Sequence, residues 1–195
     1  MTRLPAVLLC LLAVSCVPSK RREVDSPSDL GSGEVLLIGR VKLTPPIAKD
    51  EQILSSVAEE WRGRVMVIIG DTFTPLERPF QVSGYKNRIE APPDREFSVA
   101  APANSFSIRG GVVPLRLHTP PSDEAVLPGG FQVQVRPGDT ALYIGTIHYH
   151  RDEFWQITKV EVEDDYDRVR TDCLRRWGPS ASLRKSIVTV PAKRD

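Results

Sequence analysis

The chain has 195 residues, with 26 Lys plus Arg against 25 Asp plus Glu, and 41% of its residues are hydrophobic. This length suits one ordinary domain with a sizeable core. The net charge of +1 comes from mixed acidic and basic positions, so the chain offers no basic surface for a phosphate backbone, and we expect no nucleic acid partner. The patterned apolar runs exclude an acidic disordered chain.

The N terminus has the pattern of an export signal. Arg3 precedes an apolar run from Leu4 to Val14, which is too short to cross a bilayer as a helix but suits the apolar region of a secretion signal. The run continues into Leu12-Ala13-Val14-Ser15-Cys16, which resembles the lipobox of bacterial lipoproteins. In that family the signal is cut just before the Cys, which then becomes acylated.

The resemblance implies that residues 1–15 are a signal peptide and that Cys16 is the lipidation site. Acyl chains such as palmitate would anchor the protein stably in a membrane of the bacterial cell envelope. Position 17 is Val and not Asp, which by the same resemblance favours the outer membrane. Two alternatives remain open at this point, an ordinary signal peptide cut near Ala13 or Ser15 and an uncleaved anchor.

Residues 16–33 are predicted to form the lipidated Cys and a flexible tether. The segment 17–33 is polar, contains Pro and Ser and has no periodicity, so a span of about 20–25 Å is expected for a coil of this length. Lys20, Arg21 and Arg22 form a basic cluster. They either contact anionic lipid headgroups or belong to a solvated linker.

From Glu34 onward the sequence predicts a single domain, residues 34–195, built from short strands. Val35, Leu37, Val41 and Leu43 share one parity, which indicates a strand with one buried face. Further apolar or alternating runs, mostly bounded by Pro, Gly, Asp or Asn, lie at 65–69, 80–85, 88–91, 97–100, 106–108, 112–117, 131–135, 141–149, 155–162 and 187–190. This pattern predicts a mainly β protein, a β-sandwich of the Ig-like or transthyretin-like kind, with one or two accessory helices.

The two helices are expected at 50–61 and at about 164–177. The first places Ile53, Leu54, Val57 and Trp61 on one side, and the second places Tyr166, Val169, Cys173, Leu174 and Trp177 on one face. Gly178-Pro179 should end the C-terminal helix. Cys173 on its apolar stripe is predicted to be a buried, inert thiol.

Two local features concern the most hydrophobic strand. Arg136-Pro137-Gly138-Asp139 suits a tight reversal, so Phe131–Arg136 and Ala141–His150 are predicted to form a hairpin. Regular alternation places Leu142, Ile144, Thr146, His148 and His150 on one face. In the following run the apolar parity changes, which predicts a bulge near Thr158-Lys159.

His148 and His150 are the candidate metal ligands. Separated by one residue, they point the same way on a strand and could chelate Zn, Cu or Ni, with Asp152 and Glu153 nearby in sequence and His118 as the third histidine. The competing interpretation is that the strand leaves the core here and these residues form a solvated turn. The acidic run from Glu161 to Asp167 is interpreted as charge at a helix start and not as a calcium loop, because it lacks the EF-hand glycine and final Glu.

The sequence carries no P-loop, G-x-S-x-G, H-E-x-x-H or C-x-x-C motif in the mature chain. Of Phe154 and Trp155, alternation would leave one facing outward as a contact for a partner, although the interpretation in which both are covered is favoured. We therefore expect a non-enzymatic envelope lipoprotein, a structural or binding module without a cofactor, whose partner is another envelope protein or a glycan. The alternatives are a periplasmic metal-binding domain using His148 and His150, and a hydrolase.

Overall fold

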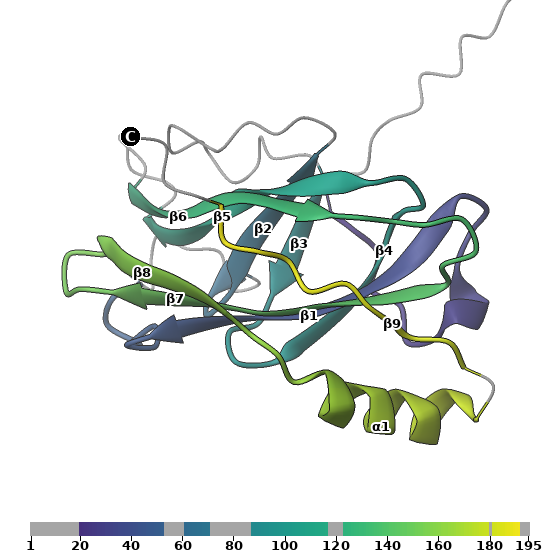
Figure 1. Cartoon of the computed structure of the whole chain (residues 1–195). Helices are drawn as coiled ribbons and strands as arrows, with labels where there is room; N and C mark the ends of the chain where they lie inside the picture. Colours follow the sequence, from purple (N-terminus) through teal and green to yellow (C-terminus); the bar gives the residue numbers. More distant parts are fainter. Residues whose placement is uncertain (1–19, 53–60, 71–86, 117–122, 180, 192–195) are drawn as a thin grey trace, which may run out of the picture.

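The computed structural model describes residues 20–52, 61–70, 87–116, 123–179 and 181–191. Two β-sheets face each other, and one α-helix lies against the outer face of the first sheet (Figure 1). The prediction of a mainly β sandwich with a C-terminal helix is confirmed.

The first sheet has the strand order β4-β1-β7-β8. Its strands are β1 (Glu34–Thr44), β4 (Glu96–Pro102), β7 (Ala141–Arg151) and β8 (Ile157–Glu163). β1 pairs with β4 antiparallel and with β7 parallel, and β7 pairs with β8 antiparallel. The short strand β9 (Arg184–Lys185) pairs with the first part of β7, so β9 and β8 follow each other along one edge of β7.

The second sheet has the order β3-β2-β5-β6, and all its pairs are antiparallel. Its strands are β3 (Arg88–Ala91), β2 (Val65–Gly70), β5 (Phe106–Arg116) and β6 (Asp123–Val133). The two apolar runs expected at 106–108 and 112–117 belong to one strand, β5. Apolar side chains from both sheets fill the space between them and form the main core.

β1 contributes to two cores because it alternates regularly. Val35, Leu37, Val41 and Leu43 lie in the main core between the sheets, as their shared parity predicted. Leu36 and Ile38 point the other way and pack beneath α1 (Tyr166–Trp177). The helix buries Val169 and Cys173 there, and Cys173 is 1% exposed, so the predicted burial of this thiol is confirmed. Burial raises its pKa, and a protonated thiol is a poor nucleophile.

β7 contains a bulge at Gly145 that sequence alternation did not predict. Ile38 pairs with Tyr143 and Arg40 with Thr146, so two residues of β7, Ile144 and Gly145, oppose one residue of β1. Gly145 has φ 96°, a conformation that favours glycine. The extra residue reverses the alternation, so the single face predicted for residues 142–150 is wrong.

The outcome is two sets of inward-facing side chains on β7. Leu142 and Ile144 before the bulge and Ile147 and Tyr149 after it all lie in the main core. His148 and His150 remain on one shared face, as predicted, but it is the outer face of the sheet, opposite to the side on which Leu142 lies.

The hairpin predicted between Phe131–Arg136 and Ala141–His150 is wrong. β6 pairs with β5 in the second sheet, whereas β7 pairs with β1, β8 and β9 in the first. The turn therefore carries the chain from one sheet to the other. Asp139 holds this crossing by accepting hydrogen bonds from Arg184 Nε at 2.8 Å and from the Arg136 amide at 2.6 Å.

Residues 20–33 also differ from the predicted flexible tether. Residues 20–24, which we call the N-terminal strap, lie along the edges of both sheets, with bridges from Lys20 to Arg88 and from Glu23 to Val99. Val24 is buried in the core beneath α1. A short 3-10 helix, η1 (Pro27–Asp29), then leads into β1. Backbone hydrogen bonds to the sheet edges hold this polar segment in place.

Two expected elements fall on residues outside the described part of the chain. These are most of the helix at 50–61, because the structure does not describe 53–60, and the strand at 80–85, which lies within 71–86. In the described part, no helix has the length and apolarity that crossing a bilayer requires.

The Gly145 bulge leads to a stability prediction. A Cβ at Gly145 would lie 3.0 Å from Val162 Cγ1 and 3.1 Å from the Glu163 carbonyl oxygen, in addition to the cost of a positive φ. We expect Gly145→Ala to destabilise the protein by about 1–3 kcal/mol in urea denaturation. Gly138→Ala is the matched control, since Gly138 has φ 88° but nothing lies within 4 Å of its Cβ position. Equal losses for the two variants would contradict the crowding at the bulge.

Candidate functional site

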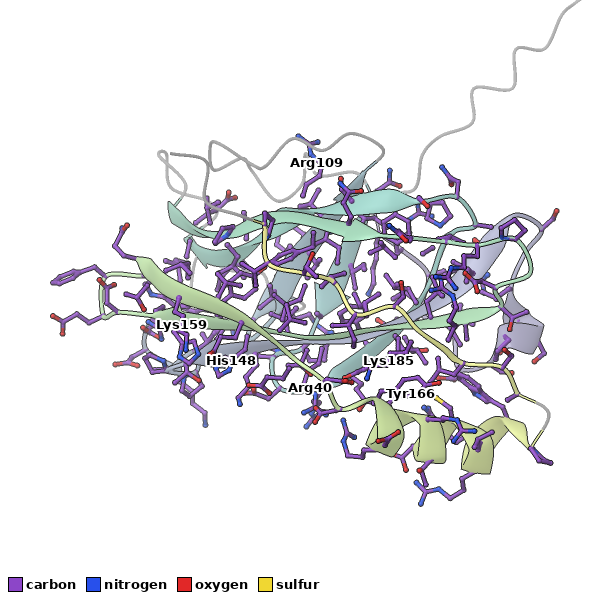
Figure 2. The ribbon with its side chains drawn as sticks, viewed as in Figure 1. Arg40, Arg109, His148, Lys159, Tyr166 and Lys185 are labelled. Atoms are coloured by element: carbon purple, nitrogen blue, oxygen red, sulfur yellow. The ribbon has the colours of Figure 1, made fainter. Side chains whose placement is uncertain are left out.

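The outer face of the first sheet is divided into an apolar half and a polar half. α1 covers the apolar half, whereas the polar half extends beyond the start of the helix and carries side chains of β1, β7 and β8. Figure 2 shows Arg40, His148 and Lys159 on this lower face, away from the second sheet. These polar side chains, gathered on one sheet face, are the candidates for a site.

His148 is the buried residue of this group. Its side chain is 7% exposed, and both ring nitrogens have partners. Nδ1 lies 2.6 Å from Glu163 Oε1, and Nε2 lies 2.8 Å from Thr44 Oγ1. Because an ionised carboxylate only accepts hydrogen bonds, Nδ1 donates to Glu163. The interpretation of a solvated turn is therefore wrong for His148.

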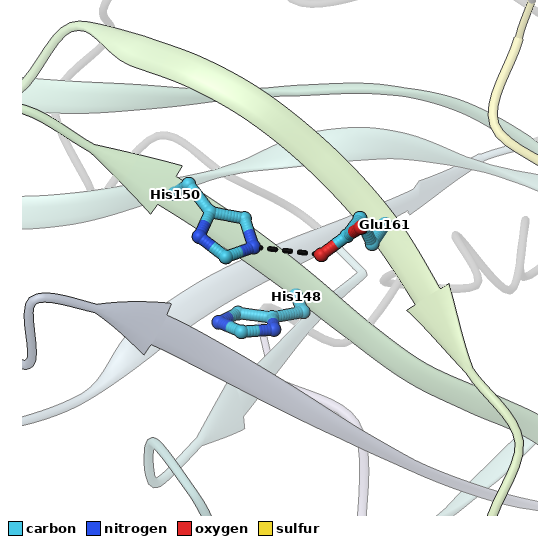
Figure 3. A group of neighbouring side chains, drawn as sticks. All are labelled: His148, His150 and Glu161. Atoms are coloured by element: carbon cyan, nitrogen blue, oxygen red, sulfur yellow. Dashed lines mark hydrogen bonds and ion pairs between the residues drawn. The ribbon is translucent and has the colours of Figure 1, made fainter.

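His150 lies beside His148 on the same face. The two ring centroids are 4.0 Å apart, and His150 Nε2 lies 2.8 Å from Glu161 Oε2 (Figure 3). The pairing of β8 with β7 brings Glu161 directly opposite His148. Thr158 has no partner in the register between His150–Lys159 and Arg151–Ile157, which confirms the predicted bulge.

The carboxylates of this cluster are held in their ionised form. Partial burial alone would raise the pKa of Glu163, but hydrogen bonds from His148 and Lys42 lower it below its usual value. The pKa of Glu161 is also lowered, first by its hydrogen bond with Lys159 and then by that with His150. The polar face is therefore a network of compensated charges with two imidazoles at its centre.

Asp152 and Glu153, which lie next to the histidines in sequence, have other positions. Asp152 Oδ1 accepts from the amides of Phe154 at 2.9 Å and Gln156 at 2.8 Å, so it shapes the turn between β7 and β8. Glu153 is exposed on that turn. The carboxylates beside the histidines are instead Glu161 and Glu163, the first two members of the acidic run.

That helix-start interpretation of the acidic run is thus wrong for its first two members, which lie on β8. It holds for Asp164, whose carboxylate accepts from the Tyr166 amide at 3.1 Å. A sequence signal for these partners does exist. Glu161 and Glu163 have the same parity on the strand that follows the strand with His148 and His150, and such a pair predicts cross-strand contacts with the histidines.

The turn between β7 and β8 also exposes an aromatic side chain. Phe154 is 74% exposed, whereas Trp155 is half-buried beneath the Arg151 guanidinium, which lies 3.8 Å from the ring centroid. The favoured interpretation, in which both aromatics are covered, is wrong for Phe154. Arg151 is itself buried and pairs with Glu51 at 2.7 Å, so the base of this turn is firmly held.

A second candidate is a cavity of about 360 Å³ beside the N-terminal strap. Four basic and four acidic residues line it, so it has no net charge to select a ligand. Ser98 supplies its hydroxyl, which donates to the Val24 carbonyl oxygen at 2.7 Å. No histidine or cysteine of the described residues lines it.

No protein-family model, no curated protein and no solved structure matches this chain. The assignment of a site therefore depends on geometry alone.

The Glu163–His148 contact leads to a pH-dependent prediction. We expect the Glu163 carboxyl to titrate below its usual range by NMR, and His148→Gln to raise its pKa because the donated hydrogen bond weakens. A lowered folded-state pKa gives stability above the unfolded value, about 4.3 for Glu, and this stability is lost as the pH falls through the folded value. Glu163→Gln should therefore be most destabilising near neutral pH in urea denaturation.

Glu153→Gln, at an exposed carboxylate on the β7–β8 turn, is the control and should show no such dependence. A Glu163 pKa that does not move in His148→Gln would contradict the assigned contact.

Proposed function

We propose that the protein is a lipid-anchored component of the bacterial envelope, attached to the outer membrane through Cys16, whose sandwich is a non-enzymatic binding module. The observation that carries this proposal is the apolar run from Leu4 to Val14 that ends at the lipobox-like Leu12–Cys16. The alternating polar and apolar strands of the sandwich provide a stable scaffold for presenting a surface to another envelope protein or a glycan.

The fold supports a short connection between anchor and domain. Lys20 already forms a bridge with Arg88 on β3, so only residues 17–19 separate it from Cys16. Four residue steps span at most about 14 Å. A lipidated Cys16 would thus hold the strap edge of the sandwich close to the headgroups, in place of the loose 17–33 tether that composition predicted.

The exposed Phe154 lies far along the first sheet from the place where the strap meets β4. The strap pairs with β4 near Val99, in a stretch that aligns with Leu36–Ile38 of β1. The β7–β8 turn extends beyond Thr44, six residues further along β1, which is about 20 Å. The turn is therefore free to meet a partner while the strap edge lies near the membrane, and an exposed aromatic on a rigid turn is a suitable contact for a protein or a sugar ring.

Cys16→Ala tests the anchor. In cells fed an alkyne-tagged fatty acid, we expect label on the wild type and none on Cys16→Ala, because the acylated sulfur and amino group belong to that residue. Cys10→Ala removes the cysteine inside the apolar run and should keep the label. Labelling of Cys16→Ala, or an unlabelled wild type, would refute lipidation at this position.

The binding role is tested by a photoreactive amino acid at position 154, followed by cross-linking in intact envelopes. We expect one discrete adduct from position 154 and none from position 171, an exposed site on α1. Phe154→Ala should leave the unfolding free energy within about 0.5 kcal/mol of the wild type, since the side chain packs little. Identical cross-linking from both positions would refute a contact specific to the turn.

A further inference from the structure

We infer that His148, His150 and Glu161 form a binding site for one divalent transition-metal ion of the Zn²⁺ class. One donor atom from each of the three side chains lies within 4.8 Å of the others. Two imidazoles and a carboxylate are a ligand set that Zn²⁺ prefers, and three protein ligands leave a fourth position open for water or a ligand. This inference goes beyond the proposed function, because it needs neither the lipid nor the partner.

The arrangement of hydrogen bonds indicates which nitrogen of His148 would bind the metal. Because Glu163 accepts from Nδ1, Nε2 is left unprotonated and is the nitrogen able to bind a metal, as in sites where a carboxylate holds the other ring nitrogen of a metal-binding histidine. Nε2 currently contacts the Thr44 hydroxyl. A metal would take the place of that proton donor, and Thr44 would then be free to hydrogen-bond a water at the open position.

His150 and Glu161 already meet through Nε2 and Oε2, 2.8 Å apart. A metal between them requires an unprotonated nitrogen, so the His150 proton would move to Nδ1. With metal–ligand distances of about 2.0–2.2 Å, the donor atoms must come within roughly 3.5 Å of one another. Glu161 is 40% and His150 29% exposed, so these two side chains have room to rotate toward the buried His148.

Electrostatics favour a cation at this position. The two imidazole rings have centroids 4.0 Å apart, so one ion could take a nitrogen from each, with the carboxylates of Glu161 and Glu163 beside it. Glu161 is ionised and its second partner, Lys159, is 61% exposed and free to swing into water. Glu163 stays paired with Lys42, so it supplies negative charge behind the site without occupying it.

The test is calorimetric titration of the chelator-treated full-length protein in detergent with Zn²⁺. We expect one equivalent to bind, and His150→Gln or Glu161→Gln to weaken Zn²⁺ at least tenfold, because each loses a direct ligand. Glu163→Gln, which weakens the orienting bond to His148 and removes the ion pair with Lys42, should weaken binding about 10–100-fold. Circular dichroism checks that these variants fold, and both His150 and Glu161 are partly exposed, so their replacement spares the core.

His118→Gln is the matched control, since it removes the third histidine of the chain and should leave binding unchanged. The inference is overturned if the wild type binds no stoichiometric Zn²⁺, or if His150→Gln and Glu161→Gln bind Zn²⁺ as tightly as the wild type. A negative result here would not bear on the proposed lipid anchor, because fatty-acid labelling of Cys16 tests that proposal separately.

Discussion

The two halves of β7 lie in different environments, and the bulge at Gly145 allows one strand to fit both. In its first half the strand lies between the main core and the core beneath α1, so both faces are apolar, whereas in its second half the outer face is polar. With regular alternation, His148 would point into the core on the same side as Leu142. An imidazole without partners in such an apolar interior costs several kcal/mol. The extra residue turns the histidines outward and brings Ile147 and Tyr149 inward, so one glycine determines both the packing of the core and the composition of the polar face.

The outer face of the first sheet changes from apolar to polar at the start of α1. Up to this point β1 presents Leu36 and Ile38 to the helix, and beyond it β1 presents Arg40, which pairs with Glu96 at 3.3 Å. Glu96 also accepts from Arg168 of the helix, so one carboxylate ties the sheet to the first turns of α1. Such half-buried pairs add little net stability, but each charge would be costly alone, and this fixes the position of the helix along the sheet. The helix therefore does not extend over the polar half, where His150 is partly exposed and His148 is buried.

The features that could be predicted from the sequence are those that depend on the periodicity of apolar residues within one segment. The alternation of β1, the extent of α1 and the bulge at Thr158 follow from patterns of two or 3.6 residues, which depend on neighbours in the chain. The hairpin prediction was wrong because a Pro-Gly turn has the same local sequence whether it joins two strands of one sheet or connects two sheets. The partner that holds this turn, Arg184, is 45 residues from Asp139 in sequence. Glu161 was missed as a site residue for the same reason, since only the register between β7 and β8 brings it to the histidines.

The N-terminal strap shows how the polar start of the domain acquires a structural role. A segment with this composition has no apolar signal, yet its backbone amides and carbonyls pair with β3 and β4, whose outer edges would otherwise present unpaired groups to solvent or to another chain. Trp177 of α1 also donates to the Asp25 carbonyl oxygen at 2.7 Å, so helix, strap and sheet share contacts. Because the strap pairs with both sheets, an insertion or deletion within residues 20–24 would displace these backbone pairs. The pairs with β3 and β4 therefore set where residues 20–24 lie on the sandwich.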